Sequence, residues 1–560
     1  MRRNLLSKAA AAVTVLAAAL AVVTVPAVPA SAGGLLINEN NFPDAAFRKY
    51  IKNNIDTNGD GTISAGEIKH TEHFDVADRG IKNLKGIEYF TYIAFLDCSN
   101  NKLTSIDLSK NTRLTSIDCE WNGLTKLVLT NNTQLRELRC DQNKITKLDL
   151  AKNTKLENMR CSDNALESLN VSGCKTLFTC YCSNNKLTKL DVSKNTQLVS
   201  LNCENNSLTE LSVNNNPLLE SLHCSGNSLS KLEISKDKSL TSLQCNDNKI
   251  TKLDLSKNTK LESLNIKGNS IKTMDLANNK ELKFLDCGAL ECLDVSGCRK
   301  LDSITLEEGK FPAELKLACG QSFSLNYYLP PYSDKGTWTC SASATAGLDG
   351  SKITGKKAGK AVLTGDFKGT KHKVSVRVLF KDVTNPKDFW YEPTYYLSDS
   401  GIVKGYDNQT SFKPDNECTR AQMVTFLWRL NGEPKPKSDK TAFTDIKKSD
   451  YFYKPVLWAV EKGITTGASK DKFDPSGVCT RAQTVTFLWR MANKPEPKSA
   501  TCRFKDVNSS DYFYKATIWA SEKKIVAGYS DNTFQPKGHC LRRQMVTFLY
   551  KYDKYINGKG

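Results

Sequence analysis

The 560-residue sequence is short of the residues and motifs that most enzymes need. It has only five histidines, and just two of them, His70 and His73, lie close together in the sequence. It contains no H-E-x-x-H zinc motif, no G-x-S-x-G nucleophile turn and no phosphate-binding glycine loop. Catalysis requires a nucleophile, a base or a metal in a defined arrangement, and no such set is evident. We therefore expect a non-catalytic protein.

A second apolar run long enough to cross a bilayer is also missing. The one long apolar run, residues 9–28, follows Arg2, Arg3 and Lys8 and precedes Ala30-Ser31-Ala32, a small-x-small cleavage motif. This order is typical of a secretory signal peptide over residues 1–32; the alternative is an uncleaved anchoring helix. We expect cleavage, an extracellular mature protein without a transmembrane segment, and either release or non-covalent retention at the envelope.

No C-x-x-C pair occurs among the 19 cysteines, which gives little support to a structural zinc site. Nine of the cysteines instead lie in a series with a period of 21 residues, and an isoleucine takes one of its positions. Because a position that accepts isoleucine is apolar, we predict buried free thiols there; disulfides or metal ligands are the alternatives. The series is Cys98, Cys119, Cys140, Cys161, Cys182, Cys203, Cys224, Cys245, Ile266 and Cys287.

The same 21-residue period covers residues 83–300 as about ten repeats. A fixed period predicts a solenoid, in which each coil buries its apolar side only when neighbouring coils stack on it. Asparagine recurs in two further series, one containing Asn122 and one containing Asn111, and its amide can satisfy backbone groups inside a coil. The pattern L-x-x-L-x-(L/C)-x-x-N resembles the leucine-rich-repeat family, which implies a β-rich solenoid.

One row of residues changes from repeat to repeat while the frame around it is constant. Most of these residues directly precede the cysteine series and are expected to face solvent, because neighbours on a strand point to opposite faces. We predict that this row binds a ligand, with Trp121 as an exposed anchor; the alternative is a solvated face without a partner. The sequence leaves open which strand is concave. The candidate ligand-binding residues are Asp118, Trp121, Arg139, Arg160, Tyr181, Asn202 and His223.

Residues 33–82 are expected to form an N-terminal cap with an EF-hand-like calcium loop. Asn41-Phe42-Pro43-Asp44 predicts a helix start. Residues 56–67 then supply oxygen atoms at the positions that calcium needs, with Gly61 at the bend. An Asn/Asp/Gly-rich surface turn is the alternative. The candidate calcium ligands are Asp56, Asn58, Asp60, Thr62 through its carbonyl, Ser64 through a water, and Glu67.

Residues 305–378 lose the 21-residue period and are richer in Thr, Gly, Val and Lys. Alternation around Trp338 and over residues 353–363 predicts a small β-sandwich, similar to the bacterial immunoglobulin-like spacer modules. Cys319 and Cys340 either form a disulfide or are two buried thiols.

The C-terminal third is basic: residues 381–560 carry 30 Lys/Arg and 20 Asp/Glu, a net charge of 30 − 20 = +10. In an exported protein this excess suits an anionic polymer outside the cell. No motif alternates basic and aromatic residues as nucleic-acid-binding modules do, so no nucleic-acid partner is expected.

A different repeat occurs three times, at residues 379–437, 440–498 and 500–556. Each copy opens with F-x-D-(V/I), at Phe380, Phe443 and Phe504, continues to F-x-P, and closes with C-(T/L)-R-(A/R)-Q before an apolar helix. These motifs resemble the S-layer homology (SLH) family. The resemblance implies a three-copy α-helical pseudo-trimer that binds secondary cell-wall polymers, whose sugars carry negative groups, typically ketal-linked pyruvate.

By the same resemblance, an arginine at the start of each closing helix and an aromatic residue from each copy would bind the polymer. Such an arginine offers a planar fork to a carboxylate, beside helix N–H groups that favour an anion. Helix capping or a surface ion pair is the alternative role. The candidate polymer-binding residues are Arg420, Arg481, Arg542, Trp390, Phe452 and Phe513.

The copies depart from the family pattern at several positions. Glutamine replaces the glutamate of the family's T-R-A-E signature in all three. Copy 3 also has Leu541 for threonine, Arg543 for alanine and Lys524 for the turn glycine, so we expect its pocket to be the most altered.

The predicted fold is therefore multidomain: a β-rich leucine-rich-repeat solenoid, a small β-sandwich and an α-helical SLH pseudo-trimer. We expect a protein of the cell wall or surface layer, held by a secondary cell-wall polymer, whose repeats bind an unknown external protein or glycan in the manner of an adhesin. The alternative is a structural component of the surface coat without a specific external ligand.

Overall fold

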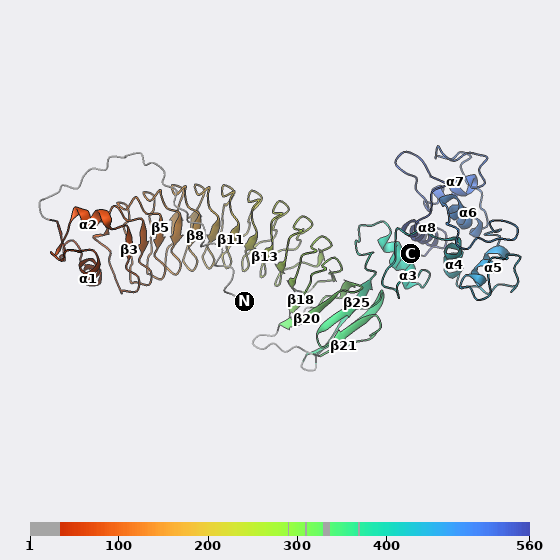
Figure 1. The fold of residues 1–560 in the computed structure, drawn as a ribbon, viewed down its shortest axis with the longest axis horizontal. Coiled ribbons are helices and arrows are strands. Elements are labelled where there is room, and N and C mark those ends of the chain that lie inside the picture. Colours follow the sequence, from red (N-terminus) through yellow and green to blue (C-terminus); the bar gives the residue numbers. More distant parts are fainter. Residues whose placement is uncertain (1–33, 289, 308–310, 329–336, 368–369, 560) are drawn as a thin grey trace.

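The computed structural model describes residues 34–288, 290–307, 311–328, 337–367 and 370–559. The molecule is elongated: a capped, curved solenoid leads into a two-sheet β region, and a cluster of helices follows at the C-terminal end (Figure 1). The predicted signal peptide and its cleavage motif lie outside the described residues. Every helix in the described part of the chain is too short or too polar to cross a bilayer.

The N-terminal cap packs on the first coil of the solenoid. Helix α1 (Ala45–Asn54) begins after Asp44, whose carboxylate accepts hydrogen bonds from the backbone N–H of Phe47 (3.0 Å) and of Lys82 (2.8 Å), so one side chain ties the helix to the coil. The other cap elements are β1 (Leu35–Leu36), β2 (Thr62–Ile63), α2 (Ala65–His70) and the 3-10 turn η1 (Ile87–Tyr89). Buried aromatic side chains, Phe42, Phe47, Tyr50, Phe74 and Phe90, close the end of the solenoid core.

Three-residue strands, one for each coil, stack in parallel into a main sheet. Successive strands pair with an offset of 21 residues, as in Leu201 with Leu222 and Leu222 with Leu243, and the middle residue of each strand is buried. The strands are β3 (His73–Asp75), β4 (Phe95–Asp97), β5 (Ser116–Asp118), β6 (Glu137–Arg139), β8 (Asn158–Arg160), β10 (Thr179–Tyr181), β11 (Ser200–Asn202), β12 (Ser221–His223), β13 (Ser242–Gln244), β14 (Ser263–Asn265) and β16 (Phe284–Cys287). This arrangement confirms the predicted solenoid.

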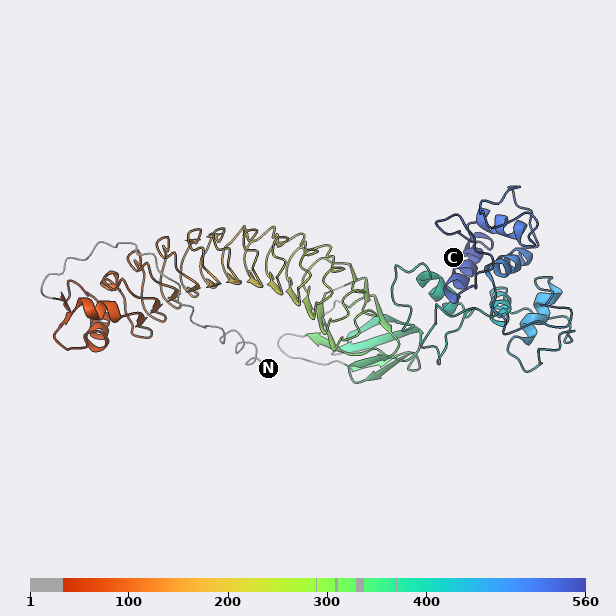
Figure 2. The same cartoon turned by 45° about the horizontal axis from the view of Figure 1, so that its top comes forward.

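The second row of the solenoid is only partly paired. It contains β7 (Lys147–Asp149) with β9 (Ser168–Asn170), and β15 (Thr273–Asp275) with β17 (Cys292–Asp294). A continuous ladder holds neighbouring strands about 4.8 Å apart, whereas unpaired segments can spread further. The coils accordingly form an arch, and the main sheet lies along its inner, concave side (Figure 2).

Two side-chain ladders fill the coils as predicted. All ten residues of the cysteine series are at most 2% exposed, and all 19 cysteines of the chain are free thiols. In the first asparagine series, the Asn122 amide donates to the carbonyl of Cys98 (3.0 Å) and accepts from the N–H of Leu103 (3.0 Å). In the second, the Asn216 amide donates to the carbonyls of Val192 (3.1 Å) and Asn195 (2.8 Å).

The β region that follows shares its two sheets with the solenoid, across the boundary predicted at residue 305. Strands β18 (Ser303–Glu307) and β20 (Ser322–Tyr328) extend the main sheet in parallel, and β23 (Lys352–Gly355) and β22 (Ala346–Asp349) complete it. The second sheet continues from β17 through β19 (Glu314–Ala318), β25 (Thr370–Leu379), β24 (Gly359–Phe367) and β21 (Thr337–Cys340). The last coil exposes two strand edges, and the predicted two-sheet region forms directly on them.

The C-terminal helices form a closed ring. They are α3 (Tyr391–Asp399), α4 (Arg420–Leu430), α5 (Tyr453–Glu461), α6 (Arg481–Met491), α7 (Tyr514–Glu522) and α8 (Arg542–Tyr555). Helix α4 packs on α5, α6 on α7, and α8 on α3, so each copy contributes its closing helix to the next copy. At the centre, backbone N–H groups donate in a cycle from Cys418 to Cys540, from Cys540 to Cys479 and from Cys479 to Cys418, at 2.8–2.9 Å. The predicted three-copy pseudo-trimer is confirmed.

Candidate functional site

The three arginines predicted to bind a polymer occupy the first helical position of α4, α6 and α8. In α4 and α6 the preceding threonine caps the helix, and in all three helices a glutamine side chain accepts from the backbone N–H of the capping residue. This reciprocal capping fixes the entry to each helix and therefore the direction in which the arginine leaves it. The side chains of Arg420, Arg481 and Arg542 are 5%, 3% and 1% exposed.

Each arginine crosses to the F-x-P segment of the next copy. The Nε of Arg420 donates to the carbonyl of Phe473 (2.9 Å), that of Arg481 to Phe534 (2.7 Å), and that of Arg542 to Phe412 (2.9 Å). The F-x-D aspartates hold the receiving segments; for example, the carboxylate of Asp445 accepts from the N–H groups of Phe473 and Asp474. Three related pockets therefore lie at the three junctions between copies, and we name them by their arginines.

Aromatic rings enclose the guanidinium groups. The Arg542 carbon Cζ lies 4.6 Å from the ring centre of Tyr406 and 4.4 Å from that of Phe412, and Arg481 lies similarly between Tyr529 and Phe534. None of the three arginines forms an ion pair with a carboxylate among the described residues. Burial lowers the pKa of each guanidinium, because removal from water penalises the charged form. The three guanidinium groups are therefore buried, and no carboxylate in the described part of the chain forms an ion pair with them, unlike the surface pair considered as the alternative.

Each predicted aromatic partner directly follows a second aromatic residue that is more exposed. Phe452 and Phe513 are the N-cap residues of α5 and α7 and are partly or wholly buried, and Trp390 has the same place before α3. In each copy, the aromatic residue just before this position is exposed to solvent: the side chain of Tyr451 is 61% exposed and that of Tyr512 is 63% exposed. The charge of Arg542 acts on the pKa of Tyr451, and that of Arg420 on Tyr512, so these tyrosines face the pockets. In the sequence, these exposed residues are visible as the first members of three aromatic doublets: Phe389-Trp390, Tyr451-Phe452 and Tyr512-Phe513.

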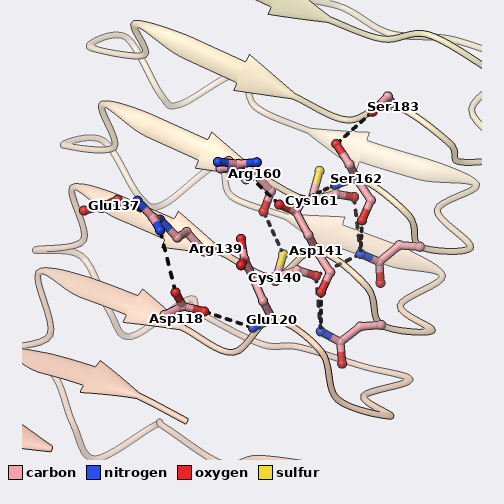
Figure 3. A network of polar contacts seen from close by, with 12 residues as sticks. Asp118, Glu120, Glu137, Arg139, Cys140, Asp141, Arg160, Cys161, Ser162 and Ser183 are labelled. Carbon is pink, nitrogen blue, oxygen red and sulfur yellow. Dashed lines mark hydrogen bonds and ion pairs between the residues drawn. The ribbon is translucent and has the colours of Figure 1, made fainter. Parts of the chain in front are cut away.

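The candidate ligand-binding residues of the solenoid share the concave main sheet, except for Trp121. We call the set Asp118, Trp121, Arg139, Arg160, Tyr181, Asn202 and His223 the display face. Near its start, Arg139 approaches Asp118 (3.9 Å) and Arg160 donates to Asp141 (3.2 Å), within a polar network that connects neighbouring coils (Figure 3). Burial raises the pKa of Asp118 to about 6. The display face therefore combines half-buried charges with exposed polar groups.

Trp121 lies in the turn beside the concave sheet and is 59% exposed. Its φ is +55°, in the left-handed region that large L-residues rarely adopt. The equivalent turn positions in the other repeats share this conformation but carry smaller or more tolerant residues: Asn100, Gln142, Asp163, Asn184, Asn205, Gly226, Asp247 and Gly268. Tryptophan is thus the least suited residue in this series, and it presents its ring to solvent.

The predicted calcium loop bends at Gly61, whose φ is +80°. Its carboxylates are hydrogen-bonded to other groups of the same loop and of the start of α2. The carboxylate of Asp56 accepts from the N–H groups of Gly59 (2.8 Å) and Gly61 (3.0 Å). Glu67 accepts from Thr57 with one oxygen and from Ser64 with the other. Within the described residues, no three His, Cys, Asp or Glu side chains gather closely enough to hold a metal ion. The oxygen donors suit calcium in kind, and Glu67 would exchange its present bonds for the ion.

Comparisons with known proteins agree with this geometry. The sequence model of the S-layer homology domain matches residues 379–424, 442–485 and 503–546. The S-layer protein sap of Bacillus anthracis is 29% identical over 179 residues, which cover 31% of this chain and 21% of that protein. The cellulosome-anchoring protein of Acetivibrio thermocellus is 28% identical over 156 residues, which cover 26% of this chain and 34% of that protein. This chain thus spans about a fifth of the length of the first curated relatives that it matches.

Among solved structures, the functional domain of InlJ from Listeria monocytogenes is similar in fold, with a TM-score of 0.45 and 24% identity. The match covers 62% of this chain and 99% of that chain, whose description includes a cysteine ladder.

Each of the three family matches falls inside one predicted copy, and each copy contributes one arginine pocket to the ring. The chain therefore carries three S-layer homology domains and is a protein of the cell surface or cell wall.

Proposed function

We propose that the SLH ring holds this protein on the cell wall by binding anionic groups of a secondary cell-wall polymer. The observation that carries the proposal is the set of three buried guanidinium groups, none of which is ion-paired to a carboxylate of the residues that the structure describes. A buried charge is costly unless a counter-charge meets it, and aromatic rings and backbone carbonyls offset that cost only in part. A carboxylate on a sugar supplies a planar partner for such a group. No catalytic role is proposed.

Co-sedimentation with purified cell-wall sacculi tests this anchoring. The full mature chain is expected to sediment with intact sacculi and to remain in solution after the acidic polymer has been extracted from them. Arg136→Gln, which alters an exposed arginine of the solenoid, is a matched control and should leave sedimentation unchanged. Retention that ignores polymer extraction would contradict the proposal.

We further propose that the display face binds an external protein or glycan, so that the chain acts as an adhesin. The support is the strained, exposed Trp121 together with a polar row that varies over a constant frame. Replacing Arg139, Arg160 and Tyr181 together by alanine should abolish capture on a glycan array or on immobilised extracellular-matrix proteins, and wall attachment should persist. Alanine at Lys147, Lys189 and Glu210 is the matched control on the opposite row. Absence of any capture by the unaltered chain would favour the structural-coat alternative.

For calcium, we propose that Asp56, Asn58, Asp60 and Glu67, the carbonyl of Thr62, and Ser64 through a water hold one ion. Bound calcium would cross-link the loop to α2 and so stabilise the cap. Addition of calcium should raise the melting temperature of the full chain relative to a chelator, and Glu67→Gln should remove that rise. Equal melting temperatures with calcium and with chelator would contradict it.

A further inference from the structure

The three pockets of the SLH ring differ in what closes them. In the Arg542 pocket, the Tyr406 ring covers the guanidinium, and its hydroxyl accepts a hydrogen bond from the Gln422 amide (2.8 Å). In the Arg481 pocket, Tyr529 and Gln544 repeat this arrangement (3.3 Å). In the Arg420 pocket, the residue at the tyrosine position is Ala468. That pocket has no tyrosine cover from the turn, and no described acceptor receives the amide N–H of Gln483.

The guanidinium of Arg420 is also less satisfied than the other two. Nη2 of Arg542 donates to the carbonyl of Lys404 (3.0 Å), and Nη2 of Arg481 to that of Ala527 (3.3 Å). Nη2 of Arg420 is buried and has no hydrogen-bond partner within the described residues. The turn that would supply an acceptor has a different backbone there: Gly467 has φ +89°, whereas the equivalent Gly405 and Gly528 do not adopt positive φ.

Unpaired buried donors are costly, and they are rare in proteins unless a ligand, an ion or water completes them. In the Arg420 pocket, Nη2 of Arg420 is such a donor. The partly exposed amide of Gln483 adds a second donor without a described acceptor, where the turn carries Ala468 instead of a tyrosine. The charges of Asp474 and Asp445 act on the pKa of Arg420, but neither carboxylate forms an ion pair with it among the described residues. The Asp445 carboxylate instead accepts from two backbone N–H groups. Tyr512 of copy 3, which is 63% exposed, borders the same pocket.

We infer that the Arg420 pocket, between copies 1 and 2, is the principal site for a carboxylate of the wall polymer, and that Ala468 makes it so. The inference rests on the proposed anchoring and adds that the three pockets are unequal. A carboxylate would accept from Nη2 of Arg420 and from the amide of Gln483. In the other two pockets the tyrosine and the backbone carbonyl already occupy the matching donors.

Glutamine at the third position of each closing helix has a defined part in this difference. Its Oε1 accepts from the N-cap backbone N–H in every copy, and in copies 1 and 3 its Nε2 donates to the tyrosine that covers the pocket arginine. A glutamate would keep the cap through the same oxygen but would replace the donor with a negative charge. Glutamine-to-glutamate changes therefore test each pocket with little disturbance of the fold.

The test is calorimetric titration of the full mature chain with purified, carboxylate-bearing polymer fragments. Gln483→Glu is expected to weaken binding about tenfold or more, while Gln422→Glu and Gln544→Glu change it less than twofold. Ala468→Tyr, which introduces the cover found in the other pockets, should weaken binding similarly to Gln483→Glu. Circular dichroism and the melting temperature of each variant confirm that the ring is folded.

The outcomes separate this inference from the proposed anchoring. Equal losses for the three glutamate variants would overturn the inequality of the pockets and leave the anchoring intact. Unchanged binding in Gln483→Glu and Ala468→Tyr, with a loss in one of the other two variants, would assign the principal site to another pocket. Absence of binding by the unaltered chain would remove the anchoring itself.

Discussion

The solenoid and the SLH ring are both built from sequence repeats, but they use repetition in opposite ways. In the solenoid each coil touches only its neighbours, and buried amides such as Asn216 connect one coil to the next in an open series. In the ring, each copy reaches into the next with a buried arginine, and the third copy returns to the first through Arg542 and Phe412. In an open series, the exposed residues of one row can differ from coil to coil while the buried ladder residues stay the same. In a closed ring, each junction between copies depends on the other two.

The largest effect is expected from breaking the ring. Arg542→Gln should lower the free energy of unfolding of the SLH ring by about 3 kcal/mol, because it removes buried hydrogen bonds to two backbone carbonyls and the contact with two aromatic rings. Tryptophan fluorescence during denaturation reports this transition, since five of the seven tryptophans lie in residues 381–560. Arg136→Gln is the control, and an unaltered ring transition in Arg542→Gln would contradict the closed-ring description.

A smaller, local effect is expected in the solenoid. Asn216→Ala should lower the free energy of unfolding by about 2 kcal/mol, because the buried carbonyls of Val192 and Asn195 lose their donor. The exposed neighbour Asn215→Ala should have almost no effect. Far-UV circular dichroism follows the solenoid transition. A loss that spread to the SLH ring would show that the open series and the ring are coupled after all.

One residue of the same asparagine ladder predicts a pH dependence. Asp237 stands where the ladder requires an amide, is fully buried, and has two carboxylate oxygens without described partners. Burial raises the pKa of Asp237 from 3.8 to about 7. The groups beside it are the amides of Asn216 and Asn258 in the ladder, and the neighbouring Lys236 and Lys238 are exposed to solvent. Because the folded-state pKa is raised, its stabilising contribution is complete below about pH 4 and is lost as the pH rises through 7.

Asp237→Asn should therefore raise the free energy of unfolding at pH 8 by about 1–3 kcal/mol and should flatten the dependence between pH 4 and pH 8. Asn258→Asp is the reciprocal variant and should introduce a second decline over the same range. Thermal melts of the unaltered chain and both variants at several pH values measure this. A pH dependence that persists in Asp237→Asn would assign it to another group.

The smallest effect concerns the display face. Trp121→Asn should stabilise the solenoid by about 1 kcal/mol, because asparagine tolerates the left-handed conformation that tryptophan resists. Asn184→Trp, at an equivalent turn, should destabilise it by a similar amount. If Trp121→Asn also weakens ligand capture, Trp121 is retained for binding at the expense of stability; unchanged capture would remove Trp121 from the display face.

Periodic features were predictable from sequence because stacking repeats them. The cysteine and asparagine ladders follow directly from the 21-residue spacing, since every coil places the same position in the same environment. The fusion of residues 305–378 to the solenoid was not predictable, because parallel pairing of β18 with β16 depends on which strand edges the last coil leaves exposed. The difference in exposure between Tyr451 and Phe452 was not predictable for a similar reason: the N-cap geometry decides which ring of the doublet is buried.

The departures of copy 3 from the family pattern have local partners in the structure. Leu541 keeps the backbone part of the cap, because its N–H still donates to Gln544 (3.1 Å), and Arg543 pairs with the exposed Asp415. A second difference between the pockets lies at Ala468, where a turn residue of copy 2 borders an arginine of copy 1. Such effects between copies emerge only when the order of packing around the ring is known.

The central claim is that buried guanidinium groups of the ring bind acidic carbohydrate. The most direct measurement is the affinity of the chain for a purified wall-polymer fragment before and after removal of its carboxylate groups. We expect that a neutral fragment, which differs from the charged one only in lacking the carboxylate, binds about tenfold or more weakly. Equal affinity for the charged and the neutral fragment would contradict it.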